Sequence, residues 1–255
     1  MFKSTSGTES HAFLRLDAVS YQYPSSAKNV FDAVNLSISR GSVTAVVGPS
    51  GCGKSTLLKV LGGLLEPTQG AVSVNYKNRK RSVSYSPQSS ALLPWLTLQK
   101  NLSLLADLRN VGISAEESAK LLGFVGLASY ASAKPSELSG GMQTRASLAR
   151  SLAGAPELLL MDEPFSSLDE LTAERIILEL SVHLQKNKPT TLFVSHNIAQ
   201  AVMLADTVLV VSGSPMKVVD CFKVDLPAIR SRGMLESVEF KRAVSEVRAS
   251  LSKNL

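Results

Sequence analysis

Long apolar stretches are absent from this sequence. No apolar run reaches the ~18 residues that a membrane-spanning helix needs. The first ten residues are polar and lack the apolar core of a signal peptide, and we expect residues 1–12 to form a loose tail. These absences predict a soluble chain that stays in the compartment where it is made and reaches a membrane only through a partner.

Cysteine is also scarce, with only Cys52 and Cys221 among 255 residues. Two cysteines so far apart in the chain provide no disulfide framework, which suits a reduced, cytosolic setting. Cys52 lies in a glycine-rich loop ahead of a predicted helix, a place where thiols are often acidified. We favour the simpler interpretation that a small side chain fits a tight loop.

Basic residues exceed acidic ones, which makes the net charge +6. They gather at 77–81 and again over 230–253. A nucleic-acid or anionic membrane surface is one interpretation, but we favour a solvated strand edge and an ordinary basic tail. Aromatic residues make up only 5% of the chain and are not interleaved with basic ones, as single-strand binding requires. We therefore expect no nucleic-acid partner.

The order of the predicted elements favours an α/β fold. Apolar strands alternate with helices from residue 158 onward, which predicts a parallel sheet with helices on both faces. Near the N-terminus, residues 13–19 and 34–39 alternate like antiparallel strands and predict a small β-subdomain. The predicted elements of the α/β part are strands at 158–161, 190–194 and 208–211 and helices at 171–184 and 198–204.

Residues from about 91 to 155 change character and predict a helical insert. Helical spacing runs over 98–108 and 141–152, and Ser114 with Glu117 forms a capping box at the start of another helix. At the C-terminus, residues 235–251 have an amphipathic pattern that is typical of a helix.

A glycine-rich loop between a predicted strand and a predicted helix is the strongest functional signal. It fits the G-x-x-x-x-G-K-[ST] pattern, whose backbone N–H groups and following helix N-terminus cradle phosphates. Lys54 would reach the β- and γ-phosphates of a nucleotide, Ser55 would ligate Mg²⁺, and Thr56 would bond near the α-phosphate. The loop consists of Gly48, Pro49, Ser50, Gly51, Cys52, Gly53, Lys54, Ser55 and Thr56.

Two carboxylates follow the apolar strand at 158–161. The carboxyl ends of parallel strands face the ligand crevice of an open sheet. Asp162 would therefore hold the Mg²⁺ shell, and Glu163 could polarise an attacking water as general base. A surface turn with acidic residues is the alternative, and the phosphate loop upstream makes it the weaker one.

A second helix start is rich in glycine. Ser139, Gly140 and Gly141 follow Leu138 and precede a stretch of helical spacing, which makes another N-terminus suited to an anion. Taken alone this signal is weak, because serine and glycine commonly begin helices.

Together these motifs resemble the ATPase subunits of ABC transporters. The resemblance covers about residues 13–212 and implies a P-loop NTPase with a parallel-sheet core, a small antiparallel β-subdomain and a helical subdomain at about 91–155. Residues 213–255 would be a short C-terminal extension. The motifs, in family order, are the phosphate loop, Gln88, Leu138 to Gly141, Leu158 to Pro164, Ser167 to Asp169, and Ser195-His196.

The resemblance implies an ATP- and Mg²⁺-dependent enzyme built from two copies of the chain. Two ATP molecules would lie between the copies, each between one phosphate loop and the partner's Ser139 to Gly141. Gln88 would reach the Mg²⁺ and the water, His196 would bond the γ-phosphate, and Asp169 would lie at the subunit contact. Tyr23 stands where the family places an aromatic residue against adenine, although a core or edge tyrosine is an equal alternative.

A narrower resemblance is to the importers of nitrate, sulfonates, taurine and related compounds. It rests on the Leu-Leu-Pro-Trp segment at 92–95, Met142, and the tail with Asp225-Leu226-Pro227 ahead of Arg230 and Arg232. It implies permease subunits, an external solute-binding protein, and a peripheral place on the cytoplasmic face of the inner membrane. Trp95 would lie near the membrane subunit, with a core tryptophan as the alternative.

The chain departs from this group at four positions, where Ser42, Thr144, Asn197 and Gln200 replace Glu, Gln, Asp and Glu. None of these changes removes a phosphate or Mg²⁺ contact. They leave open the tuning of the cycle and the transported solute. The alternatives to an importer are an ABC ATPase of an exporter or of a nucleic-acid system, and a non-catalytic nucleotide sensor. The chemistry-bearing residues Lys54, Asp162, Glu163 and His196 argue against the sensor.

Overall fold

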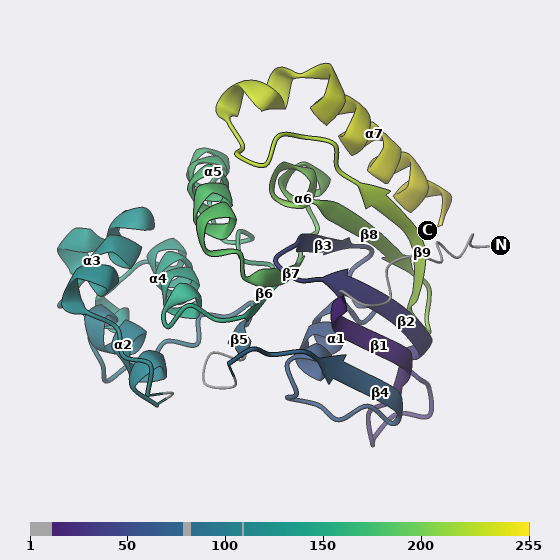
Figure 1. The fold of residues 1–255 in the computed structure, drawn as a ribbon, viewed down its shortest axis with the longest axis horizontal. Helices are drawn as coiled ribbons and strands as arrows, with labels where there is room; N and C mark the ends of the chain where they lie inside the picture. Colours follow the sequence, from purple (N-terminus) through teal and green to yellow (C-terminus); the bar gives the residue numbers. More distant parts are fainter. Residues whose placement is uncertain (1–11, 79–82, 109, 255) are drawn as a thin grey trace.

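The computed structural model describes residues 12–78, 83–108 and 110–254, and it contains two sheets (Figure 1). The larger sheet has six strands in the order β5-β6-β7-β3-β8-β9, and the smaller has the order β2-β1-β4. The strands are β1 (Ala12–Tyr21), β2 (Phe31–Ser39), β3 (Val43–Val47), β4 (Gln69–Val74), β5 (Val83–Ser86), β6 (Leu158–Asp162), β7 (Thr190–Val194), β8 (Thr207–Ser212) and β9 (Lys217–Lys223).

The core of the larger sheet is parallel, as the strand–helix alternation predicts. The first five strands in this order, β5, β6, β7, β3 and β8, each pair in parallel with their neighbours. Strands β3, β6 and β7 are buried along their whole length. They are mostly apolar, apart from buried threonines in β3 and β7 and Asp162 at the end of β6, because both faces of such a sheet are covered. One strand, β9, was not predicted. It pairs antiparallel with β8 at the edge, and its half-exposed, mixed sequence carries no clear alternation.

The smaller sheet confirms the predicted antiparallel strands near the N-terminus. β1 pairs with β2 and also with β4, which lies beyond the first helix in the chain. Gly70 in β4 has φ +79, and a Cβ there would lie 2.3 Å from the carbonyl oxygen of Ala18. Only glycine therefore allows β4 to approach β1 so closely.

Helices cover the larger sheet on both faces. Successive strand side chains point to opposite faces, so Val46 and Leu160 pack with α1 (Lys54–Leu61) and the smaller sheet. Ala45 and Phe193 join the opposite core. That core includes residues of α4 (Gly140–Leu152), α5 (Glu170–Asn187), α6 (Ile198–Leu204) and α7 (Val238–Lys253).

Between β5 and β6 the chain forms α2 (Leu98–Leu108), α3 (Ala115–Phe124) and α4, which lie together beside the sheet (Figure 1). The predicted capping box is confirmed: Ser114 accepts a hydrogen bond from the Glu117 N–H, and the Glu117 carboxylate accepts one from the Ser114 N–H. The division of the chain into domains stays a prediction. Among the described residues, no helix combines the length and apolar character that crossing a membrane requires.

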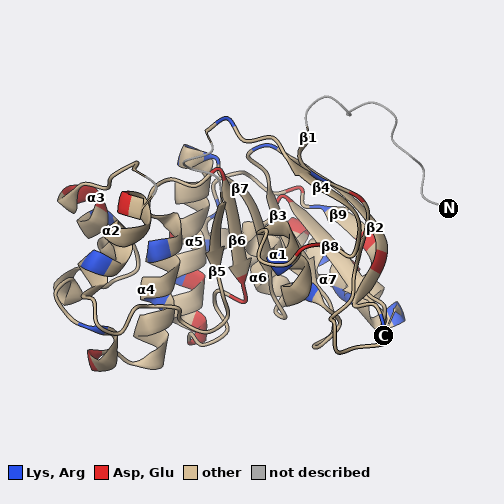
Figure 2. Cartoon of the chain, turned by 90° about the horizontal axis from the view of Figure 1, so that it is seen from below, with Lys and Arg blue, Asp and Glu red and all other residues tan. Residues whose placement is uncertain are grey.

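The basic residues differ in their exposure to solvent. Acidic and basic residues are interspersed over α2 and α3 (Figure 2), and Arg232 and Lys241 form exposed ion pairs, as a solvated surface would. Arg230 is the exception, because it is buried rather than part of a solvated tail. Residues 79–81, part of the predicted basic strand edge, and residues 1–11 of the predicted tail lie outside the described residues. The prediction was wrong for Ala12, the last residue of that tail, because it begins β1 and pairs with Ser39 of β2.

Candidate functional site

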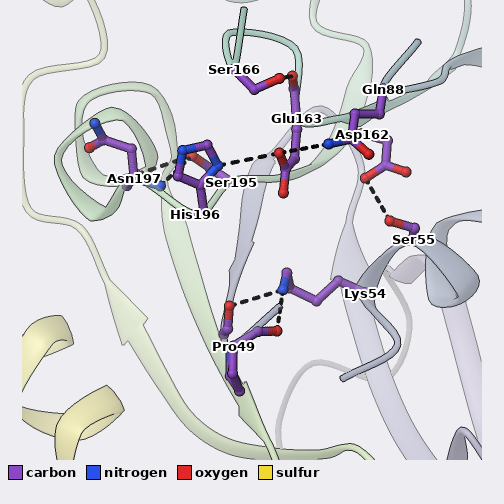
Figure 3. A network of polar contacts seen from close by, with 11 residues as sticks. Pro49, Lys54, Ser55, Gln88, Asp162, Glu163, Ser166, Ser195, His196 and Asn197 are labelled. Atoms are coloured by element: carbon purple, nitrogen blue, oxygen red, sulfur yellow. Dashed lines mark hydrogen bonds and ion pairs between the residues drawn. The ribbon is translucent and has the colours of Figure 1, made fainter. Parts of the chain in front are cut away.

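The carboxyl ends of four neighbouring parallel strands bring the predicted site residues together. Lys54 follows β3, Asp162 and Glu163 end β6, His196 follows β7 and Gln88 follows β5. Because β5, β6, β7 and β3 are neighbours in the sheet, their carboxyl ends meet at one edge. Figure 3 shows Glu163 in contact with both Gln88 and His196, Asp162 beside Ser55, and Lys54 turned toward the loop at Pro49.

The phosphate loop holds its lysine inside the turn. The Nζ of Lys54 donates hydrogen bonds to the carbonyl oxygens of Gly48 (2.9 Å) and Pro49 (2.6 Å), and its side chain is buried (Figure 3). Gly53 has φ +115, and a Cβ there would lie 2.5 Å from Cγ1 of Val30. Glycine is therefore required for this turn into α1, which places an ammonium group beside a helix N-terminus.

Ser55 and Asp162 form the oxygen pair expected for Mg²⁺. The Ser55 hydroxyl donates to Oδ1 of Asp162 at 2.9 Å, and the Tyr85 hydroxyl lies 3.4 Å from Oδ2. Burial raises the pKa of the Asp162 carboxyl, and the Ser55 hydrogen bond opposes this rise. Mg²⁺ prefers such oxygen ligands, and its charge would offset the cost of burying the carboxylate. The two residues thus fit the ion.

Glu163 lies between an amide and an imidazole. Its Oε2 accepts a hydrogen bond from Nε2 of Gln88 at 3.2 Å and lies 3.3 Å from Nδ1 of His196. The residue has φ +50, a left-handed conformation that costs energy outside glycine, while its N–H donates to the carbonyl oxygen of Val194. The side chain keeps 20% exposure. A carboxylate held this way can orient a water and accept its proton.

The second glycine-rich helix start does not join this group. The Ser139 hydroxyl accepts a hydrogen bond from the Met142 N–H and caps α4, with Gly140 exposed and Gly141 half-buried in the first turn. In Figure 1, α4 lies with α2 and α3 in one helical block, and β5 and β6 separate this block from α1. Within one chain, the two anion-ready helix starts are therefore separate.

Two further predicted residues occupy defined places near the site. The Tyr23 hydroxyl lies 3.0 Å from Oγ1 of Thr56, at the side of the phosphate loop, and its ring meets Tyr21 edge-on. Asp169 caps α5 by accepting a hydrogen bond from the Thr172 N–H, which lowers the pKa of the Asp169 carboxyl. The adenine contact of Tyr23 and the subunit contact of Asp169 stay predictions.

Sequence reasoning missed the polar contacts that link α4 to the loops around Glu163. The Ser90 hydroxyl donates to the side-chain oxygen of Gln143, and the hydroxyls of Thr144 and Ser167 lie 2.6 Å apart. Threonine at position 144, where the importer group usually has glutamine, was the one sign of these contacts in the sequence. The sequence could not show that its partner is Ser167. Asn197 has a simpler explanation, because it caps α6 as the usual aspartate would.

Comparison with known proteins identifies the family. The family model described as "ABC transporter" matches residues 31–166, more than half of the chain. The chain belongs to the ABC transporter family. It is an ATP-binding cassette and an ATPase, which confirms the resemblance and the fold expected from the motifs.

Individual relatives agree with this assignment. The cassette is 36% identical to an uncharacterized ABC transporter ATP-binding protein of Methanocaldococcus jannaschii, over 89% of this chain and 87% of that protein. It is 39% identical to a bicarbonate transport ATP-binding protein of Synechocystis, over 80% and 76%. Among solved structures, it resembles a dimeric ATP-binding cassette in a post-hydrolysis state with ADP and Pi, with TM-score 0.74, 28% identity, and coverage of 84% and 100%.

The substitution Asp162→Asn is expected to stabilise the nucleotide-free cassette and to weaken its binding of Mg²⁺. Burial raises the pKa of the Asp162 carboxyl, and neither its hydrogen bonds nor the charge of Lys59 cancels that rise, so removing the charge relieves a cost of burial. Asp162→Asn should raise the Tm without nucleotide by about 2–4 °C, the equivalent of roughly 1 kcal/mol. Thermal denaturation with and without Mg-ATP would measure this, and Glu170→Asn is the control. A lower Tm for the nucleotide-free variant would contradict the prediction.

Proposed function

We propose that this cassette works as a nucleotide-sandwich homodimer that energises uptake of a small solute through permease subunits. The observation that carries the proposal is the divided site. The phosphate loop, Asp162 and Glu163 supply one wall, and the helix start at Ser139 to Gly141, exposed at Ser139 and Gly140, lies away from the phosphate loop of its own chain. The similar solved cassettes are dimers, which supports a second copy as the source of the missing wall.

In this proposal the residues divide the work of hydrolysis. Lys54 neutralises the β- and γ-phosphates, and the partner's Ser139 to Gly141 N-terminus contacts the γ-phosphate from the other side. Glu163 orients the attacking water and accepts its proton, while His196 and Gln88 hold the carboxylate and sense the γ-phosphate. Ser55, Asp162 and Gln88 would hold Mg²⁺, which supplies charge neutralisation when it is bound.

Import of a small solute is supported by the relatives and by the earlier family resemblance. The similarity to a bicarbonate transport ATP-binding protein supports a role in the transport of a small compound. We propose a nitrate-, sulfonate-, taurine- or bicarbonate-like solute, with an external binding protein delivering it. The cassette would then sit on the cytoplasmic face of the inner membrane, held by its permease.

Capture of tagged cassette from detergent-solubilised membranes of its own cells tests this function. Co-purification of a polytopic membrane subunit, followed by ATP-dependent solute uptake in vesicles that contain both, is the expected result. Nucleic acid in place of a membrane subunit would contradict the proposal and favour the non-transport alternative.

A rigid turn presents Trp95 as a docking point for the permease. The side chain of Trp95 is 67% exposed, so the core alternative for this residue is wrong. Buried Asn101 fixes the turn: its Oδ1 accepts from the Leu93 N–H, and its Nδ2 donates to the carbonyls of Leu93, Leu96 and Thr97. Because the backbone of this turn is already ordered, binding through Trp95 would cost less conformational entropy than binding through a flexible loop.

Trp95→Ala is expected to weaken permease binding at least about tenfold, the effect of a typical interface hot spot. ATP hydrolysis by the isolated cassette should stay unchanged, because Trp95 is exposed and takes no part in the hydrogen bonds that join the site residues. Co-sedimentation with permease-containing membranes measures the affinity. Tyr130→Ala, a less exposed aromatic residue of the helical block, is the matched control. Equal membrane binding by wild type and Trp95→Ala would rule out this docking point.

A further inference from the structure

A buried guanidinium from the C-terminal extension lies at the end of α6. Arg230 is only 5% exposed, although it stands in the loop between β9 and α7. Its Nε donates to the carbonyl oxygen of Met203 at 3.1 Å, its Nη2 to that of Ala205 at 2.8 Å, and its Nη1 to that of Pro227. The last carbonyls of a helix lack intrahelical partners and favour a cation, so Arg230 acts as a cap for α6.

His196, the histidine that contacts the Glu163 carboxylate, lies at the opposite end of α6. His196 immediately precedes the cap residue Asn197, whose side chain accepts a hydrogen bond from the Gln200 N–H. Ser195 closes the same turn, since its hydroxyl donates to the Asn197 carbonyl and accepts from the Asn197 N–H. Residues 201–204 are buried in the core. The seven residues of α6 thus form a short, packed element between Arg230 and His196.

The same junction is tied to the strand that leads into the phosphate loop. Asp206 follows α6, and its carboxylate accepts a hydrogen bond from the Val43 N–H at 2.8 Å. The Asp206 N–H donates to the Val43 carbonyl, and its own carbonyl accepts from the Val224 N–H. The end of α6, the start of β3 and the residue that follows β9 therefore meet at one point, where Arg230 holds the helix.

We propose that Arg230 is a positioning residue for ATP hydrolysis. By capping α6 it holds His196 where Nδ1 lies 3.3 Å from the Glu163 carboxylate. The inference rests on the proposed function, in which His196 and Glu163 act together. A guanidinium suits the task because its several fixed donors can serve three carbonyls at once, which a lysine ammonium cannot do with the same geometry.

Arg230→Met tests the proposal, and Arg232→Met is the matched control. Arg232 lies two residues further on, but it is exposed and forms an ion pair with Glu174. We expect Arg230→Met to lower kcat by about tenfold, because small displacements of a positioning group cost much of the rate. The KM for ATP should stay within about twofold, since Arg230 does not touch the phosphate loop. Arg230→Lys should fall between wild type and Arg230→Met, and Arg232→Met should behave like wild type.

A double-variant cycle separates positioning from a general structural role. If Arg230 acts through His196, Arg230→Met should lower kcat no further in a His196→Ala background. Hydrogen exchange should also accelerate at the amides of residues 201–204 in Arg230→Met and stay unchanged in α1. Equal losses in both backgrounds, or wild-type kcat in Arg230→Met, would overturn the positioning role alone. Wild-type kcat in His196→Ala would overturn the proposed role of the histidine and the positioning role with it.

Discussion

Glu163→Gln is expected to lower the kcat for ATP hydrolysis by about 10²- to 10⁴-fold, the range that a general base contributes. The amide keeps the shape of the side chain and can still meet Gln88 and His196, but it cannot accept a proton from water. The affinity for ATP should be preserved, because the phosphate loop and Lys54 are unchanged. Single-turnover hydrolysis and nucleotide binding, measured on the same preparation, test both halves of this expectation.

The matched control is Glu170→Gln, seven residues further along the chain. Glu170 stands in the first turn of α5 and is exposed, with no contact to the Glu163 carboxylate. It should therefore retain wild-type hydrolysis, apart from a small loss of helix-dipole stabilisation. Hydrolysis at the wild-type rate by Glu163→Gln would remove Glu163 from the catalytic role.

Two inactive variants are expected to restore activity when they are mixed, if each site is shared between two copies. Gly140→Asp puts a carboxylate where the partner's γ-phosphate is expected, and a Cβ at Gly140 meets nothing within 4 Å in its own chain. Both Gly140→Asp and Glu163→Gln homodimers should therefore be nearly inactive. A mixed dimer has one site that carries both defects and one site that carries neither. An equimolar mixture should recover about a quarter of wild-type activity, because half of the dimers are mixed and each has one intact site.

A second mixture provides the control. Lys54→Ala and Glu163→Gln alter the same wall of the site, so every site in their mixed dimer keeps a defect and activity should not return. The proteins should be combined before ATP is added, because ATP-bound Glu163→Gln dimers would exchange subunits slowly. Gly123→Asp, at another exposed glycine without neighbours, should stay active and excludes a general effect of added charge. Failure of Gly140→Asp and Glu163→Gln to complement, with mixed dimers shown by native mass spectrometry, would contradict the shared site.

Much of the fold and of the one-chain site was predictable, for reasons that lie in local sequence. Strands β3, β6 and β7 are short, mostly apolar segments, and the residues that carry the chemistry stand at or after the end of each. Parallel strands in one sheet must end at the same edge, so Lys54, Asp162, Glu163 and His196 were expected near one another before any coordinates. Strand β9 escaped prediction because its partly exposed side chains follow no clean period, and it is specified by pairing with β8.

By itself, the sequence determined the reaction class, the α/β fold and the residues of the phosphate loop and its acidic partner, because short motifs specify those features locally. The tertiary structure decided what depends on distant segments meeting. It showed that the Thr144 hydroxyl lies against that of Ser167 and that Asn101 holds the turn that carries Trp95. It also showed that Arg230 is buried at the end of α6 and is not a solvent-exposed residue of a basic tail. From sequence alone, an arginine is expected at the solvated surface. Only the packed structure shows the three carbonyl oxygens whose hydrogen bonds compensate for the burial of the Arg230 guanidinium.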